Sequence, residues 1–510
     1  MQPTRAQGEF DCRYFLFGVF LLALALGTGE EPRGDPGVRL AITRQLLSHG
    51  RVHLADPHWG FIQTPSGWTS CFAIGQTLLF IPFEIVGKVL ALLSPSALTL
   101  DVRHFPLEYL YCPLVGVAYF LALLSLLGVL GLSARAAAIA SLLFTFCSLS
   151  AYYVAQSFQE EGIASVFVCL CLGAALRWQH SAEKRHAFAA GLWCASIFLF
   201  RYTAIFVLLP LGVLFVQGFH RMGLGSLRAR QSAGAALLGA LGPAAIYMLF
   251  AYLRFGNLFS TGYDHEVPVW DNVSYALWQP LQLEAVRSLL FGLGKGLFIF
   301  SPLLTIAFWG MWIDRARHAL YGIACLAALA GSVIFSAFYF TPDGCWSWGT
   351  RYQVHLLPLF AYPAWVGMRD LLRRRVGVPI VAIALGCGLF FQLCGLLASM
   401  EVEYVQLRKN QVPIPTLVEV CRIVREHQFA MRLGNIASVI RVVGEGGEIM
   451  DPVLRRVFGH LWVLRLVRDH SGWARGAVIF AWLGIFVGAA TCLYRALLLE
   501  GAGSKWVIRY

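Results

Sequence analysis

Acidic side chains stand beside the long apolar stretches of this 510-residue chain, where they could do chemistry. Asp35 follows the first apolar stretch, with Glu30 and Glu31 as nearby alternatives, and Glu160 and Glu161 close a later polar loop. A carboxylate held near an incoming hydroxyl group can accept its proton, which is general-base catalysis. We therefore predict Asp35 as a catalytic base, with Glu160 or Glu161 as a second carboxylate at the same site.

The same carboxylates also have structural interpretations. Asp35 precedes Pro36, and an Asp at the N-cap with Pro at the first helical position begins many helices. Glu160 and Glu161 would be favoured in the first turn of a helix by its dipole. Since a capping residue at an exposed helix start can still accept a proton, both roles of Asp35 stay open.

Basic side chains at the borders of apolar stretches are candidates for holding a phosphate. Lys295 lies in a glycine-rich segment that a ligand could approach, although glycines in membrane helices also serve close packing. Arg351 leads directly into an apolar segment, and its guanidinium suits a forked contact with phosphate. Arg201 interrupts an apolar stretch, which is costly unless it reaches the interface or meets a carboxylate or a substrate. Arg254 is a further candidate.

Aromatic residues surround Arg351. Trp346, Trp348 and Tyr352 fit either an aromatic belt at a membrane surface or a stacking surface for a sugar, and Tyr263 is a fourth candidate for substrate contact. We favour the substrate-binding interpretation because Arg351 lies directly before an apolar segment.

A divalent metal is a possible cofactor. Asp264, His265 and Glu266 offer oxygen and imidazole ligands of the right kind. Three consecutive residues rarely reach one ion, so a solvated polar run is the favoured interpretation. No cofactor is therefore predicted with certainty.

The composition excludes a soluble domain. The chain is 58% hydrophobic and 13% charged, with a mean hydropathy of +0.65. Many apolar stretches approach the length that crosses a bilayer, so we predict a polytopic helical membrane protein. The net charge of +12 then indicates basic cytoplasmic loops rather than nucleic-acid binding. Most cysteines lie in apolar runs without metal-site spacing and are expected to be structural thiols.

The apolar stretches predict an all-α fold of about 12 transmembrane helices. They cover about 14–29, 109–131, 134–153, 162–178, 187–200, 203–217, 232–253, 288–310, 319–340, 352–367, 376–400 and 477–498. Clusters of arginine and lysine in alternate loops indicate the cytoplasmic side, which leaves 151–161, 254–287 and 341–351 outside.

Two segments of the first external loop are predicted as interfacial helices. In 37–48, apolar residues share one face and polar residues another, which is typical of a helix lying on a membrane. Pro82, Glu84 and Lys88 interrupt 71–93, leaving about thirteen apolar residues, too few to span a bilayer.

These features divide the chain into five parts. The first is a cytoplasmic N-terminus with the first helix, which we expect to be retained although it resembles a signal peptide. The last but one is a small external domain containing a helix near 417–429. The boundaries are 1–29, 30–108 (first external loop), 109–400 (multi-spanning catalytic domain), 401–476 (external domain) and 477–510 (last helix and cytoplasmic tail).

Several short sequence segments, taken in their order along the chain, resemble the C-type glycosyltransferase superfamily. The closest likeness is to bacterial relatives of protein O-mannosyltransferases and of the aminoarabinose transferase of lipid A. The segments are Asp35 in the first loop, Gly75-Gln76-Thr77-Leu78-Leu79, Tyr152-Tyr153 with Glu160-Glu161, Arg201-Tyr202-Thr203, Leu253-Arg254-Phe255-Gly256-Asn257, Thr261-Gly262-Tyr263, Gly294-Lys295-Gly296-Leu297-Phe298 and Trp348-Gly349-Thr350-Arg351-Tyr352.

The resemblance covers about residues 14–370 and implies a membrane glycosyltransferase of the cell envelope. Such an enzyme takes a hexose or pentose from a polyprenyl-phosphate donor and gives it to a lipid, glycan or protein acceptor. By position, Asp35 corresponds to the family's external Asp, which acts as base or helps bind the acceptor or a metal, and Glu160 or Glu161 corresponds to the second loop acid. Lys295 and Arg351 correspond to the donor-phosphate ligands, with Arg201 and Arg254 as weaker matches. The implied location is the bacterial inner membrane, with the site facing outward.

Two other functions compete with this one. A transporter or lipid flippase needs polar residues along a pathway at mid-membrane depth, whereas here the apolar runs are nearly clean. A scaffold would use 401–476 for docking. The polar residues gather at one face, which favours interfacial chemistry.

Overall fold

The computed structural model describes most of the chain. The described residues are 11–29, 31–54, 61–94, 102–262, 268–269, 273–274, 278–339, 341–344, 347–398, 403, 406, 417–444, 461, 463 and 473–499. This part is almost entirely helical, as predicted, with two small antiparallel hairpins.

The helices and strands follow one another in this order: α1 Cys12–Leu26, α2 Asp35–His49, β1 Phe61–Thr64, β2 Gly67–Ser70, α3 Gly75–Leu93, the π-helical turn η1 Pro106–Leu110, α4 Tyr111–Val129, α5 Ala134–Phe146, α6 Ser150–Ala155, α7 Glu160–Ser181, α8 Lys184–Phe200, the 3-10 helix η2 Tyr202–Val207, α9 Leu208–Met222, α10 Leu227–Phe255, β3 Pro268–Val269, β4 Val273–Ser274, α11 Leu283–Phe291, α12 Leu297–Phe300, α13 Leu303–Ile313, α14 Arg315–Ala337, the 3-10 helix η3 Arg351–Phe360, α15 Ala361–Leu371, α16 Gly377–Leu397, α18 Leu417–Gly444, α20 Trp473–Tyr494 and the π-helical turn η5 Arg495–Leu499.

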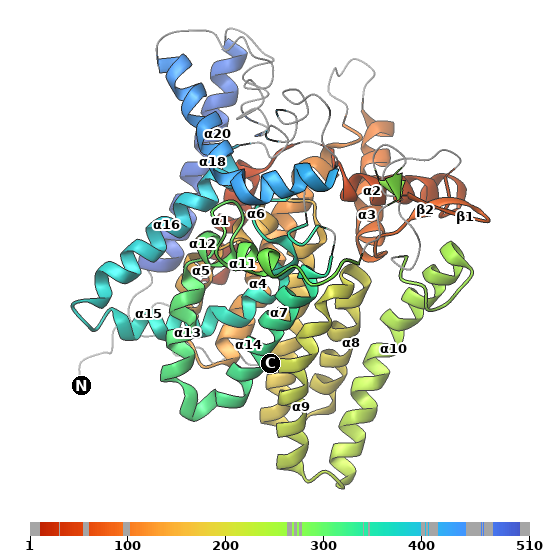
Figure 1. Cartoon of the computed structure of the whole chain (residues 1–510), viewed down its shortest axis with the longest axis vertical. Coiled ribbons are helices and arrows are strands. Elements are labelled where there is room, and N and C mark those ends of the chain that lie inside the picture. The colour runs from red at the N-terminus through yellow and green to blue at the C-terminus, as the bar shows by residue number, and fades with distance from the viewer. Residues whose placement is uncertain are drawn as a thin grey trace.

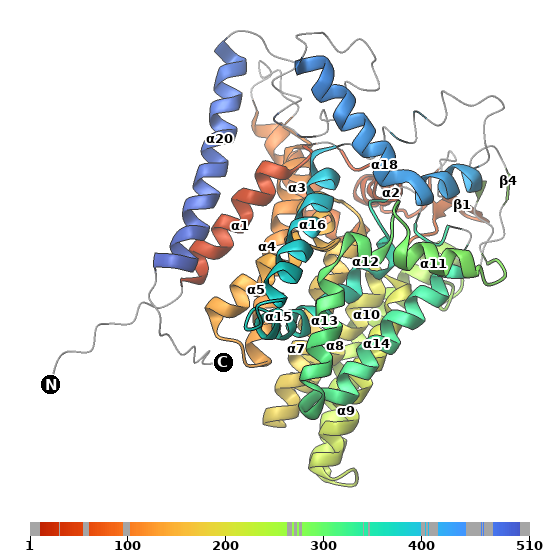
Figure 2. The same ribbon diagram turned by 60° about the vertical axis from the view of Figure 1, so that its left-hand side comes forward.

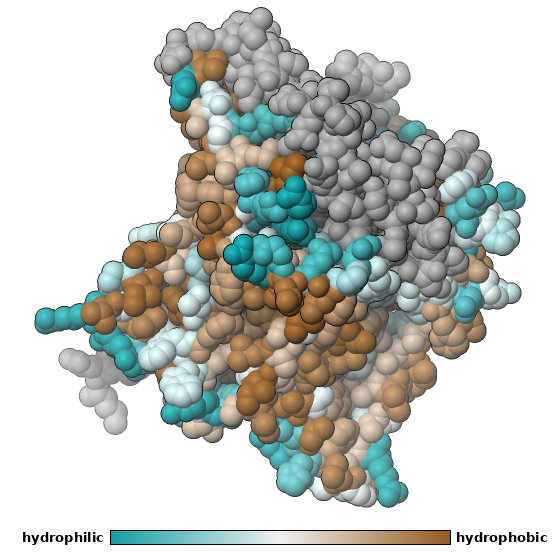
Figure 3. All heavy atoms as spheres, viewed as in Figure 1, coloured by the Kyte–Doolittle hydropathy of each residue, from teal (hydrophilic) through white to brown (hydrophobic). Residues whose placement is uncertain are grey.

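The exposed surface of the bundle is apolar, as a bilayer requires. By length and composition, eight helices in the described part could cross a membrane, and α1, α5 and α13 are shorter apolar helices. On α10, Leu237, Leu238 and Leu241 are 60% or more exposed. In Figure 3 hydrophobic residues cover the surface over α10, while hydrophilic ones gather at the lower tips of the bundle. These exposed apolar helices are those of an integral membrane protein.

Four of the twelve predicted spans divide into more than one element: 203–217 falls in η2 and α9, 352–367 falls in η3 and α15, and two others are broken by turns. The stretch 134–153 divides into α5 and α6, and 288–310 divides into α11, α12 and α13. In the second case the glycine-rich turn and Ser301-Pro302 separate three short helices, although the sequence reads as one apolar run. A count of hydrophobic residues does not reveal such breaks. The structure thus supports a helical membrane bundle without supporting the number twelve.

Helix α3 also differs from the expectation. It is continuous through Pro82, and its 19 residues are long and apolar enough to cross a membrane. Glu84 does not end the helix, because its side chain pairs with Arg44 of α2 at 3.1 Å. The prediction that this segment is too short to span was therefore wrong about its length.

The connections at the two ends of the bundle differ in character. The short links between α7 and α8, between α9 and α10, and between α13 and α14 are flanked by arginines and lysines on the adjoining helix ends, and these arginine-rich links lie together at one end. Helix α2, the start of α7 and helix α18 lie at the opposite end in both views (Figures 1 and 2). The candidate residues of the site are thus gathered at one end of the bundle, away from the arginine-rich links.

Helix α2 is not a simple interfacial helix. Its apolar residues Val38 and Ile42 are buried, and so are Arg39 and Thr43, on the face that was expected to be polar and exposed. The Thr43 hydroxyl donates to the carbonyl of Thr77 in α3 at 2.9 Å. Both faces of α2 therefore contact protein, because the polar face finds polar partners inside the fold.

The helix predicted near 417–429 is present as the longer α18. It lies across the same end of the bundle as α2, near α11, α12 and α16 (Figure 2). Arg432 of α18 is fully buried and donates to the carbonyl of Ala398 at 2.9 Å. This helix therefore contacts the bundle through a buried arginine side chain, and the predicted external domain 401–476 stays a prediction.

Candidate active site

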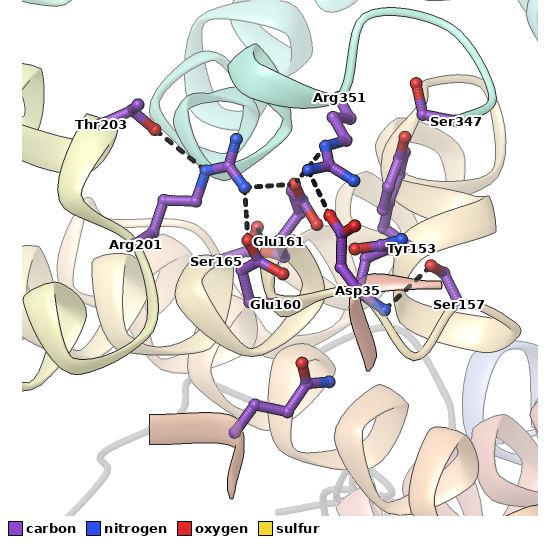
Figure 4. A network of polar contacts seen from close by, with 12 residues as sticks. Asp35, Tyr153, Ser157, Glu160, Glu161, Ser165, Arg201, Thr203, Ser347 and Arg351 are labelled. Atoms are coloured by element: carbon purple, nitrogen blue, oxygen red, sulfur yellow. Dashed lines mark hydrogen bonds and ion pairs between the residues drawn. The ribbon is translucent and has the colours of Figure 1, made fainter. Parts of the chain in front are cut away.

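Asp35 is the first residue of α2 and is 6% exposed. Gly34 occupies the N-cap, with a φ of 61° that favours glycine, and the helix start has no side-chain cap. The Asp35 carboxylate instead accepts from Arg351 at 2.7 Å (Figure 4). The helix-cap interpretation of Asp35 was therefore wrong, because its side chain points to a partner in a distant loop rather than back to its own helix.

Arg351 joins two carboxylates. Besides Asp35, its Nε lies 3.5 Å from the Glu161 Oε1. Its side chain packs against Gly344, where a Cβ would meet the Arg351 Cγ at 2.5 Å and where φ is +85°. Burial disfavours the charge, but Asp35 and Glu161 more than offset this and raise the pKa of Arg351. The guanidinium is thus held charged between acids from two loops.

Glu160 and Glu161 form the first turn of α7 and face Arg201 (Figure 4). The Arg201 NH1 donates to Glu160 at 2.6 Å and to Glu161 at 2.7 Å, and its Nε donates to Thr203 at 2.9 Å. Arg201 ends α8, so the dipoles of α7 and α8 favour these charges as well. The sequence left Arg201 either paired with a carboxylate or a substrate, or exposed at the membrane interface. In the structure it is buried and paired with carboxylates.

Arg39 extends the cluster toward α3. Its NH2 lies 2.9 Å from the Glu160 Oε2, and its NH1 donates to Gln76 at 3.0 Å. Gln76 in turn donates to the carbonyl of Phe158, just before α7. Asp35, Arg39, Glu160, Glu161, Arg201 and Arg351 are called the carboxylate cluster below. Each of these side chains is at least nine-tenths buried.

Lys295 lies in a second group, the lysine cluster of Lys295, Asp343 and Ser347. The fully buried Lys295 Nζ is 2.6 Å from the Asp343 carboxylate and 3.4 Å from the Ser347 hydroxyl. Arg351 joins the two clusters, since its backbone N–H donates to the Asp343 carbonyl at 3.4 Å. Burial lowers the pKa of Lys295, against the opposing effect of Asp343.

The aromatic residues divide into two roles. Tyr352 lies beneath two guanidinium groups, 4.7 Å from Arg201 and 5.3 Å from Arg351. Trp348 is fully buried, with Phe300 against its edge and Arg432 over its ring at 4.4 Å. Tyr352 is therefore part of the charged site, whereas Trp348 packs the loop and presents no open face to a sugar.

Arg254 lies apart from both clusters. Its NH1 donates to the carbonyls of Ser70 at 3.1 Å and Phe72 at 2.6 Å, which ties the end of α10 to the segment after β2. The guanidinium thus donates hydrogen bonds to backbone carbonyl groups. The predicted phosphate contact of Arg254 has no support in this arrangement.

Five of the predicted site residues lie outside the described residues. They are Trp346, Tyr263, Asp264, His265 and Glu266. Within the described part, no group of three acidic, histidine or cysteine side chains could hold a metal, because arginines separate the carboxylates. Every cysteine whose side chain is described is a free thiol.

Sequence reasoning missed two partners of the site. Arg39 is one helical turn after Asp35, a spacing that places both on one side of α2. Asp343 heads the loop that ends at Arg351 and was not singled out. The available signal was the cost of burying Arg201 and Lys295, which requires an acid for each.

Comparisons with known proteins give fold-level likeness only. No family model and no curated protein matches the sequence. The oligosaccharyltransferase AglB from Archaeoglobus fulgidus, in complex with an inhibitory peptide and a dolichol-phosphate, is 12% identical over 79% of this chain and 58% of that one, with a TM-score of 0.45. The Archaeoglobus fulgidus oligosaccharyltransferase complex with Zn and sulfate is 14% identical over 78% of this chain and 55% of that one, with a TM-score of 0.44.

The chain spans a little over half the length of these archaeal proteins. They are transferases of oligosaccharides, and the motifs of this chain resemble a glycosyltransferase superfamily. At this identity and TM-score, the likeness carries no argument about activity, which must rest on the site.

Proposed function

We propose that this protein is a membrane glycosyltransferase that moves a sugar from a polyprenyl-phosphate donor to a hydroxyl-bearing lipid, glycan or protein acceptor. The observation that carries the proposal is the ion pair of Asp35 with Arg351, within a buried cluster that also includes Glu161. These residues lie at the starts of three helices, α2, α7 and η3, at one end of an apolar bundle. Buried charges of this number are costly in a membrane protein and commonly mark a functional site.

The chemistry requires a base and a group that stabilises the leaving phosphate. The acceptor oxygen attacks the anomeric carbon, the bond from that carbon to the phosphate oxygen breaks, and its electron pair stays on the phosphate. Arg351 and Lys295 stabilise this charge. The Asp35 carboxylate takes the proton of the acceptor hydroxyl group.

The ion pair suggests how the base is controlled. While Arg351 binds Asp35 at 2.7 Å, that carboxylate oxygen is occupied by the guanidinium and is not free to contact an acceptor hydroxyl group. A donor phosphate competes with Asp35 for the same guanidinium. Arrival of the donor would thus draw Arg351 away from Asp35 and free the carboxylate to contact the acceptor, while Glu160 and Glu161 keep Arg201 in position.

The end of the bundle that carries the site is proposed to face outward. The arginine-rich links lie at the other end, and such links favour the cytoplasmic side. A bacterial inner membrane with an outward site agrees with this arrangement. A transporter or flippase remains the alternative, and it would move a lipid without breaking its sugar–phosphate bond.

The test is sugar transfer by purified protein in vesicles, using a panel of labelled polyprenyl-phosphate sugars and extracted membrane acceptors. Wild-type protein should transfer at least one sugar. Asp35→Asn should reduce transfer by roughly 10²–10⁴-fold, as expected for loss of a general base. Its membrane insertion should persist, because Asn preserves the volume of the side chain and Glu161 still offers Arg351 a counter-charge.

Glu31→Gln is the matched control, since Glu31 is close in sequence but pairs with Arg44 outside the cluster. It should transfer at the wild-type rate. Full activity of Asp35→Asn would eliminate Asp35 as the base. Movement of the intact lipid-linked sugar across the vesicle membrane, without transfer from any donor, would favour the flippase.

A further inference from the structure

Helix α18 turns a polar face toward the bundle. Arg425, Gln428, Arg432 and Asn435 are all at least nine-tenths buried, and their spacing places them along one side of the helix. A buried polar face requires a partner for each side chain. The motif resemblance ends near residue 370, so nothing in it explains why this helix is polar where it meets the site.

Three of these four side chains form hydrogen bonds, although the Gln428 Oε1 has no donor among the described residues. Gln428 donates to the carbonyl of Ser347 at 2.9 Å. Arg432 forms a forked pair with Glu403 at 2.8 and 2.9 Å. The side chains of Asn435 and Gln406 exchange hydrogen bonds at 2.8 and 2.9 Å. These contacts hold α18 firmly and account for its packing.

Arg425 is different. It is 8% exposed, its Nε has no hydrogen-bond partner, and no carboxylate of the described residues forms an ion pair with it. The neighbouring acid on the helix, Glu426, pairs with Arg422 on the exposed side. A buried guanidinium with no counter-charge among the described residues is unfavourable, and an anionic ligand would offset that cost.

Arg425 is placed at the lysine cluster. The backbone of α18 at Arg425 lies directly against Gly294, the residue before Lys295, and a Cβ there would clash with the Arg425 carbonyl. One turn later, Gln428 binds Ser347, whose hydroxyl is 3.4 Å from the Lys295 Nζ. Arg425 also contributes to lowering the pKa of Lys295, as a nearby positive charge does.

The basic side chains at this end of the bundle differ in whether an acid neutralises them. Lys295 is already matched by Asp343, and Arg351 is matched by Asp35 and Glu161. Arg425 brings a positive charge that no acid of the described residues matches. A phosphate beside Lys295 would meet two cations, one matched by an acid and one not. This is the arrangement that a phosphate of single negative charge would complete.

We propose that Arg425 of α18 binds the phosphate group of the polyprenyl-phosphate lipid together with Lys295, so that α18 forms one wall of the donor site. This inference rests on the proposed function for the identity of the lipid, but the binding can be measured without any transfer. It assigns a ligand-binding role to a helix that lies beyond the segments of the motif resemblance.

The test is binding of a photoreactive polyprenyl monophosphate to the full-length protein in lipid nanodiscs. Arg425→Ala should weaken binding roughly tenfold to a hundredfold, as for loss of a charged hydrogen bond. Arg425→Lys should recover part of the affinity. Arg422→Ala is the matched control, because Arg422 is exposed on the same helix, and it should bind like the wild type.

Competitors identify the ligand. Unlabelled polyprenyl monophosphate should displace the probe, whereas the uncharged polyprenol should displace it weakly and equally from wild type and Arg425→Ala. Inorganic phosphate or phosphatidylglycerol competing as well as the polyprenyl monophosphate would overturn the assignment to this lipid.

Thermal unfolding separates binding from packing. Removal of an unmatched buried charge should leave the melting temperature of Arg425→Ala unchanged or raise it, while binding falls. Unchanged binding, or a loss of binding in step with a lower melting temperature in both Arg425→Ala and Arg425→Gln, would overturn the proposal. If Arg425-dependent binding is found but no sugar is transferred, the donor-site inference stands as a lipid-phosphate site and the transferase proposal fails.

Discussion

Helix α2 carries ion pairs at both ends, and the two sets differ in burial. At its start, Asp35 and Arg39 enter the carboxylate cluster, where every side chain is at least nine-tenths buried. Near its end, Arg44 is 35% exposed and binds Glu31, which is 43% exposed, and the buried Glu84 of α3. One helix thus offers a direct comparison of a buried and a half-exposed ion network.

The comparison separates positioning from chemistry. Arg44, Glu31 and Glu84, called the Arg44 group below, tie α2 to α3 and to the segment before α2. A structural role explains this group fully. The carboxylate cluster joins α2, α7, the end of α8 and the loop before η3. Attachment of these elements could be achieved by apolar packing at lower cost, since buried ion pairs seldom stabilise more than apolar residues of similar size. The charges are therefore best explained by a ligand.

The largest effect is expected for Arg351→Ala. The change removes the arginine partner of the buried Asp35 and one of the arginine partners of the buried Glu161. This loss costs about 3–5 kcal/mol of the free energy of unfolding. Transfer should also be lost, because the same guanidinium is proposed to bind the donor phosphate. Thermal unfolding in detergent and the transfer assay measure the two effects separately.

A double variant then tests whether stability and function can be divided. Arg351→Met combined with Asp35→Asn removes one positive and one negative charge together, so most of the lost stability should return. Transfer should stay absent. Recovery of transfer along with stability would mean that the pair only holds the fold, and the contrast with the Arg44 group would disappear.

A middle-sized effect concerns pH and the lysine cluster. Burial holds the pKa of Lys295 below its usual value, despite Asp343. The unfolded chain then binds this proton more tightly, so stability rises with pH between the lowered pKa and the ordinary lysine value of about 10.4. Donor binding should fall over the same range, because neutral lysine attracts phosphate poorly.

Opposite trends of stability and affinity with pH are the signature of this cluster. Binding of the polyprenyl monophosphate and thermal unfolding should be measured across the alkaline range. Lys295→Arg is the control, since arginine stays charged throughout and should abolish the loss of affinity. An affinity of the wild type that does not change with pH would remove Lys295 from the donor site.

The sequence indicated the site better than it indicated the elements around it. Asp35, Glu161 and Arg351 were expected to share one site, and the structure brings them into contact. The signal was physical, because a charge beside an apolar stretch must find a partner or reach water. Their roles in catalysis remain predictions.

Features that depend on tertiary partners could not be predicted. The polar face of α2 reads the same whether it meets lipid headgroups or the side chains of another helix, so the buried Thr43 was misinterpreted. Likewise, 288–310 is uniformly apolar around Lys295, and only the fold shows that it breaks into three short helices. Arg425 had no local signal at all, since an arginine on a charged helix is usually exposed.

The smallest effect is expected in the half-exposed ion network around Arg44. Glu31→Gln removes one acid from Arg44, which keeps its forked contact with Glu84 at 3.1 and 3.2 Å. A half-exposed pair is worth about 0–1 kcal/mol, so the melting temperature should change little. High salt should narrow even this difference, because screening already weakens the pair. A Glu31→Gln variant that lost transfer while its stability held would place the Arg44 group within the site, and the boundary between the two networks of α2 would have to move.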